Sequence, residues 1–173
     1  MGALEKIAAT EFIGEEFATW LYWRSETNSG KMKLDGVEEF ELWFEAPVEL
    51  VCDFGEATTV ALKGGTPLES PEARQALREN KLISKAALRL LWRNQTFTFG
   101  FRAQSFAVAG LKVPVPPNAA PADYLHLRLE ILQEFEAFFQ KVFEAFLKLR
   151  LTDKAWTQER KRMADWVKAF DLA

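Results

Sequence analysis

Basic side chains recur along one predicted β-hairpin, SKAALRLLWRNQTFTFGFR at residues 84–102. Because alternate residues of a strand face the same side, the large apolar residues share one face of this hairpin. The opposite face carries four cations, which are Lys85, Arg89, Arg93 and Arg102. Cations about two residues apart on a strand stand roughly 7 Å apart, comparable with phosphate spacing along a nucleic-acid strand. This pattern predicts contact with a polyanion.

The register of the hairpin depends on its turn. A two-residue turn at Asn94 and Gln95 predicts that Trp92 lies opposite Phe97, within a series of apolar pairs worth roughly 0.2–1 kcal/mol each. Asn-Gln is a poorer turn than Asn-Gly, so the register could move. A slip of one residue would turn the arginines toward the core, which favours the proposed register.

A second explanation exists for each basic group. The hairpin cations could keep an exposed sheet face soluble, or pair with the acids of VEEFELWFEA at residues 37–46. Near the end of the chain, a second basic cluster predicts another DNA-binding surface, and a solvated helix face is its alternative. Its members are Lys148, Arg150, Lys154, Arg160, Lys161 and Arg162.

Residues suited to catalysis are scarce. The chain has one His and one Cys, and it lacks a phosphate-binding glycine loop, an HExxH motif and paired-cysteine metal spacing. His126 opens a predicted helix, where a lone His is usually a surface residue, and Asp53 disfavours a reactive thiolate at Cys52. The adjacent carboxylates of Glu15 and Glu16 diverge instead of converging on one bond. We therefore expect no enzyme, no cofactor and no metal site.

Length and composition fit a soluble globular protein. The 173 residues suit one domain, 49% of them are hydrophobic, and the net charge is −3. This charge excludes polyanion binding over the whole surface but allows a local basic patch. The N-terminus is too polar for a signal peptide, no run approaches the roughly 18 apolar residues of a membrane span, and a lone Cys excludes an internal disulfide. We expect a cytoplasmic protein without membrane association.

Periodicity predicts the elements that position these groups. A helix is expected over residues 10–27, followed by strands and a short helix with Ser70 as its N-cap and Pro71 at its first position. After the hairpin, apolar residues at three-to-four spacing predict a long helix, and a further helix begins at Thr152 and Asp153. The predicted fold is α+β: an antiparallel sheet with a short inserted helix, an N-terminal helix and a long C-terminal helical pair.

The domain organisation follows from the same pattern. Residues 1–113 are expected to form the α+β sheet domain. The proline-rich tract at 114–122 cannot continue a sheet and serves as a stiff connector. The helices of residues 123–173 are then expected to pack on the same domain.

Aromatic residues are in surplus, with 15 Phe and 6 Trp. Trp20, Tyr22 and Trp23 surround one short predicted helix, where not every ring can face a single core. These three residues are therefore candidates for a partner-binding surface. A well-filled core is the alternative.

Four segments resemble a known family in their order along the chain. They are GEEFATWLYWRSE (14–26), LKGGTPLESPEARQALRENKLISKAALRL (62–90), VAGLKVP (108–114) and FEAFLKLRL with the following Trp (143–156). Together they resemble the C-terminal part of RdgC-like, recombination-associated proteins, over roughly residues 12–170.

The resemblance implies a non-enzymatic DNA-binding protein with little sequence preference, associated with the nucleoid. Members of the family dimerise into a ring around duplex DNA and restrain RecA-promoted strand exchange. A full-length member also has an N-terminal half without a counterpart in this sequence, and ring closure uses both halves. The expected partners are double-stranded or single-stranded DNA, with a homo-oligomer or a companion subunit that supplies the missing half. The alternative function is a protein-interaction subunit of a phage-related or defence-related assembly.

Overall fold

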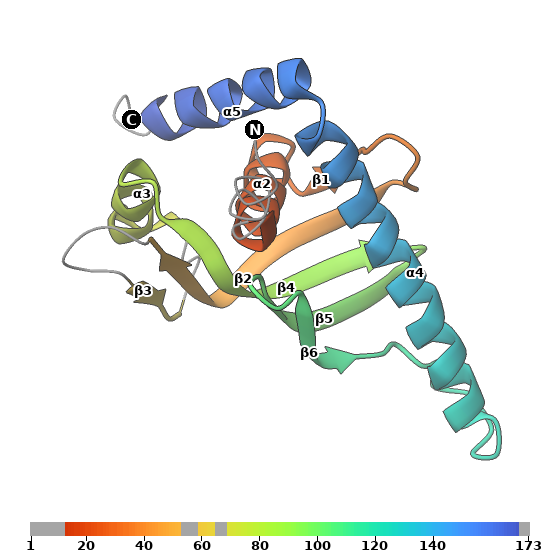
Figure 1. The fold of residues 1–173 in the computed structure, drawn as a ribbon. Coiled ribbons are helices and arrows are strands. Elements are labelled where there is room, and N and C mark those ends of the chain that lie inside the picture. The colour runs from red at the N-terminus through yellow and green to blue at the C-terminus, as the bar shows by residue number, and fades with distance from the viewer. Residues whose placement is uncertain (1–12, 53–58, 65–68, 170–173) are drawn as a thin grey trace.

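A computed structural model describes residues 13–52, 59–64 and 69–169 and shows an α+β fold (Figure 1). An antiparallel sheet carries an N-terminal helix and a long C-terminal helix on the same face, and a short helix is inserted between strands. The predicted fold class is confirmed. Residues 1–12, where we expected no signal peptide, lie outside the described residues, and so do residues 170–173 at the end of the last predicted helix. No helix in the described ranges is long and apolar enough to cross a membrane.

The described part of the sheet has six strands. They are β1 (Lys31–Met32), β2 (Phe40–Val51), β3 (Thr59–Leu62), β4 (Leu82–Trp92), β5 (Gln95–Arg102) and β6 (Ala107–Lys112). The strand order is β1-β2-β4-β5-β6, and β3 also pairs with β2. All pairs are antiparallel.

Four described helices complete the fold. They are α2 (Ile13–Thr27), α3 (Pro71–Arg78), α4 (Tyr124–Arg150) and α5 (Asp153–Lys168). The N-cap of α3 is the predicted one, since the Ser70 hydroxyl accepts the Ala73 N–H at 3.1 Å. After α2, Gly30 turns the chain at a φ of +81°, where a Cβ would lie 2.7 Å from the Trp43 ring nitrogen. Glycine is required there by both conformation and space.

Aromatic packing joins the sheet to α2 and α4. Ring centroids lie 5.0 Å apart for Phe97 and Phe135, and 5.2 Å apart for Phe99 and Phe135. On the α2 side, Phe17 meets Phe101 edge-on at 5.9 Å. These rings bury large apolar areas and favour offset and edge-to-face contacts. They fix which face of β5 points inward.

The hairpin turn lies one residue earlier than predicted. Arg93 and Asn94 form the turn, with φ values of +50° and +59°. Two consecutive positive φ values define the hairpin turn that matches strand twist, and Asn adopts this conformation readily. As a result Leu90 faces Phe97 instead of Phe99, and every cross-strand partner shifts by two positions. The two faces of the hairpin keep their predicted polarity, because a shift of two does not exchange them.

The last helix forms a third layer over α2 (Figure 1). Glu159 of α5 is buried and accepts the indole N–H of Trp20 at 3.1 Å. Its carboxylate also lies 3.6 Å from Arg24 and 3.5 Å from Arg162. A buried carboxylate is stable only when it is paired in this way. Glu159 therefore ties α5 to α2.

We expect Glu159→Leu to lower the free energy of unfolding by about 1–3 kcal/mol, because the buried Trp20 N–H loses its acceptor. Glu159→Gln keeps an acceptor oxygen and should lose less. Urea denaturation of the two variants and the wild type measures the difference. Equal losses in both variants would show that the Trp20 hydrogen bond is not what holds α5 in place.

Candidate nucleic-acid interface

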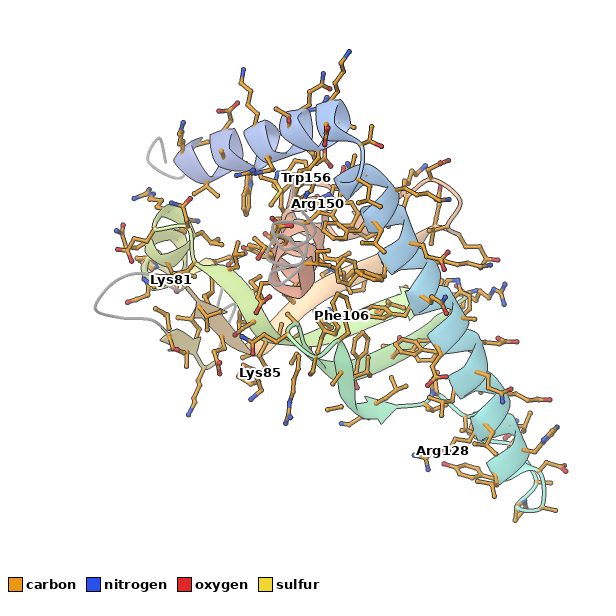
Figure 2. All side chains as sticks on the ribbon, in the orientation of Figure 1. Lys81, Lys85, Phe106, Arg128, Arg150 and Trp156 are labelled. Atoms are coloured by element: carbon orange, nitrogen blue, oxygen red, sulfur yellow. The ribbon has the colours of Figure 1, made fainter. Side chains whose placement is uncertain are left out.

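The outer face of β4, β5 and β6 is the face opposite the helices. Lys85 on β4 lies directly opposite Arg102 on β5, and both side chains are exposed. Figure 2 shows Lys85 on the side of the sheet away from α5. On the same face, exposed Lys112 of β6 lies opposite Thr98. Within the described ranges, Lys85, Arg102 and Lys112 form no ion pair. We call these three residues the outer-face cations.

Arg89 shares this face but is already paired. Its Nε lies 2.9 Å from Glu45 Oε1. The guanidinium also lies over the Trp43 ring, 4.5 Å from the centroid. This contact is a cation–π interaction. The alternative of pairing with acids of residues 37–46 therefore applies to Arg89.

Arg93 lies in the turn and not on the strand face. It donates to both oxygens of Glu38, at 2.8 Å from Nε and 2.7 Å from Nη2, and its Nη1 lies 3.7 Å from Glu134 of α4. The same carboxylate accepts the Trp92 indole N–H at 2.8 Å. Hydrogen bonds from Arg93 and then Trp92 hold the pKa of Glu38 below its ordinary value. Arg93 thus links the segment before β2, the hairpin turn and α4.

The C-terminal basic cluster is divided in a similar way. Arg150 lies 2.6 Å from Glu16, with its guanidinium over the Trp156 ring at 5.3 Å, and Arg162 pairs with Glu159. The remaining members are exposed and form no ion pair with a residue that the structure describes; they are Lys148, Lys154, Arg160 and Lys161. Since α2 lies between α5 and the sheet (Figure 1), this cluster and the outer-face cations occupy opposite sides of the molecule.

The proposed partner-binding rings lie in the core. Trp20 and Tyr22 are each 2% exposed and Trp23 is 6% exposed. Tyr22 packs against Phe44 at 5.3 Å and against Trp166 of α5 at 5.6 Å. These rings are therefore unavailable to a partner, because α5 covers the side of α2 that faces away from the sheet. Nearly every residue from Gly14 to Trp23 is buried. The run FATWLYW is apolar on all sides of the helix, which is typical of a helix in the centre of a protein.

The residues considered for catalysis do not form a site in the described part of the chain. His126 is exposed and pairs with Glu130 one turn away, at 3.0 Å. No group of three His, Cys, Asp or Glu residues in the described ranges could hold a metal ion.

Sequence reasoning missed two features of the outer face. Lys112 lies in the apolar run QSFAVAGLKV and is opposite Thr98 in the structure. The alternation of side chains along this run was the signal that could have assigned Lys112 to the outer face. The opposition of Lys85 and Arg102 was hidden by the misplaced turn, which paired Arg102 with Ala87 instead.

Comparisons with known proteins add no relative: no protein-family model matches the chain, and no curated protein matches it. The resemblance to RdgC-like proteins therefore stays a hypothesis.

We expect Glu38→Gln to lower stability at neutral pH and to have little effect in acid. The pKa of Glu38 is lowered in the folded state, so its contribution is present above the ordinary glutamate pKa and is lost as the pH falls through the lowered value. Denaturation of wild type and variant across this acidic range measures the gap, which should close as the pH falls. Glu144→Gln, which changes a carboxylate bonded only to Gln140 among described residues, is the control. A gap independent of pH would contradict the role of the Arg93–Glu38 contact.

Proposed function

We propose that this protein binds DNA without catalysis and with little sequence preference, through the outer-face cations. The observation that carries the proposal is the direct opposition of Lys85 and Arg102, neither of which forms an ion pair with a described residue. Like charges directly opposite each other destabilise a sheet. A bound phosphate removes this repulsion. In a face that serves only the stability of the fold, the same repulsion would bring no benefit.

The surroundings of the pair suit a nucleic-acid backbone. Directly opposite residues have Cβ atoms about 4.5–5.5 Å apart, so Lys85 and Arg102 can contact one phosphate or two neighbouring ones. Thr98 and Gly100 lie between them and Lys112, which leaves a low surface with a hydroxyl donor. Contacts of this type fix a protein on the backbone but read no bases. They account for binding that is independent of sequence.

Charge on the neighbouring strand limits the proposed surface. Glu41, Glu45 and Glu49 alternate along β2, and the partner of Glu49 across the sheet is Lys85. These acids repel phosphate, and Glu45 also neutralises Arg89. The proposed backbone path therefore crosses β4, β5 and β6 and avoids β2. Local basic patches of this type bind polyanions even when the net charge of a protein is negative.

The biological part of the proposal rests on the sequence resemblance. Sequence-independent DNA binding fits a protein that controls recombination or replication by occupying the substrate. Nucleoid association would follow from DNA binding. The helix α5, which carries Lys154, Arg160 and Lys161, lies on the other side of α2 from the sheet (Figure 1), so a straight duplex on the outer face would not reach it.

The sharpest test is Lys85→Glu, which should weaken DNA binding and leave the stability of the fold nearly unchanged. The variant creates an opposite-charge pair with Arg102 and a like-charge pair with Glu49, and these two effects, each worth a few tenths to about 1 kcal/mol, offset one another. Loss of the contacts at Lys85 and Arg102 should lower duplex affinity about tenfold or more at low salt. It should also reduce the slope of log K against log salt concentration by about 1.8, or about 0.9 for each lost phosphate contact.

Fluorescence anisotropy with labelled duplexes of two unrelated sequences, at several salt concentrations, measures these quantities. Lys154→Glu on α5 is the matched control, because it changes the net charge by the same amount on the opposite side. An equal loss of DNA affinity in the two variants would show that the change in net charge, and not the outer face, accounts for the effect. Unchanged binding by Lys85→Glu would remove the outer face from the proposal.

A further inference from the structure

The first turns of α4 project beyond the sheet (Figure 1). Tyr124, Leu125 and Leu129 are 47%, 66% and 49% exposed. Burial begins only at Ile131, and Phe135 is fully inside the core. Exposed apolar side chains scattered singly are normal, but a contiguous group of them marks an interaction surface. We call residues 124–130 the projecting tip.

A groove adjoins this tip on one side of α4. It has a volume of about 510 Å³ and lies between the helix and the start of β6. The sheet side of the groove is formed by Phe106, Val108 and Leu111, of which Phe106 and Val108 are 37% exposed. The helix side is formed by Leu132, Phe135, Glu136, Phe139, Gln140 and Phe143. Glu136 is the charged residue among these lining residues.

The tip and the groove lie on a continuous stripe of α4. Steps of three or four residues connect Leu125, Leu129, Leu132, Glu136, Phe139 and Phe143 along one face. Residues with this spacing are neighbours on a helix surface. The apolar side of the tip therefore continues directly into the groove, and one occupant could cover both.

Two charged residues, one beside this stripe and one within it, form no ion pair with a described residue. Arg128 is exposed on the projecting tip, as Figure 2 shows, and Glu136 lies in the groove. Four other charged or titratable side chains of this region are paired, His126 with Glu130 and Glu134 with Arg93. Arg128 and Glu136 are eight residues apart, which is about 12 Å along a helix, so they cannot meet within one chain.

We propose that a second copy of this chain covers the groove, with the two α4 helices antiparallel about a two-fold axis beside Leu132. In this arrangement Arg128 of each copy meets Glu136 of the other, and Leu125 of each meets Phe139 of the other. A two-fold interface must be self-complementary, because the same surface serves on both sides. The stripe meets this requirement: its tip carries exposed apolar side chains and a cation, and its groove carries an apolar lining and a carboxylate.

This dimer does not depend on the proposed DNA binding. The groove lies on the side of the sheet that carries α4, so pairing would leave the outer-face cations open. A dimer would present two such faces, and its mass can be measured in the absence of DNA. Failure of either proposal is therefore recognised separately.

The test is a charge exchange between Arg128 and Glu136, followed by sedimentation velocity over a range of protein concentrations without DNA. The wild type should form a dimer. Arg128→Glu and Glu136→Arg each create two like-charge contacts per dimer and should raise the dissociation constant about tenfold or more. The double variant, which carries both substitutions, should restore the dimer. Lys141→Glu makes the same change as Arg128→Glu at an exposed position about 140° round the helix from Glu136, outside the groove lining, and should have no effect on dimerisation.

Leu125→Glu gives a second test that folding defects cannot confuse, because Leu125 is 66% exposed. This variant should sediment as a monomer with the helix content of the wild type. A wild type that remains monomeric at every concentration would overturn the proposal. So would single variants that still dimerise, a double variant that stays monomeric, or an assembly larger than a dimer.

Discussion

The packing of aromatic rings against one face of β5 determines the rest of this structure. Phe97, Phe99 and Phe101 alternate along the strand and contact rings of α2 and α4. Because side chains of a strand alternate between faces, the burial of these rings turns Arg102 to the opposite face. Across the hairpin the same constraint turns Lys85 outward. The direct opposition of these two cations is therefore a consequence of how the core is filled.

Much of this arrangement could be predicted from the sequence, because it depends on local periodicity. Alternation along residues 84–102 gave the two faces of the hairpin, and Ser70 with Pro71 gave the start of α3. The turn was misplaced because positive φ values at Arg93 and Asn94 carry no strong signal without glycine. The one-residue difference in the position of the turn decides whether Arg102 lies opposite Ala87 or opposite Lys85. The alternation of polar and apolar residues is the same in both registers, so it does not distinguish them.

Contacts between segments distant in sequence were out of reach for a different reason. The acid that pairs with Arg89 depends on the register of β2 against β4, which shifts between Glu45 and Val48. Periodicity also does not reveal that α5 folds back over α2 and encloses Tyr22 against Trp166. Partners of this type are set by tertiary packing. As a result a row of four predicted cations divides into two that stabilise the fold and two that stay available.

The central claim, that the outer face of β4 to β6 contacts phosphate, is tested most directly by lysine footprinting. Acetylation of exposed lysines can be measured by mass spectrometry with and without duplex DNA, at low salt. The account predicts that DNA protects Lys85 and Lys112, while Lys154 and Lys161 on α5 remain as reactive as in the free protein. Unchanged labelling of Lys85 and Lys112 at saturating DNA, with protection on α5 instead, would contradict it.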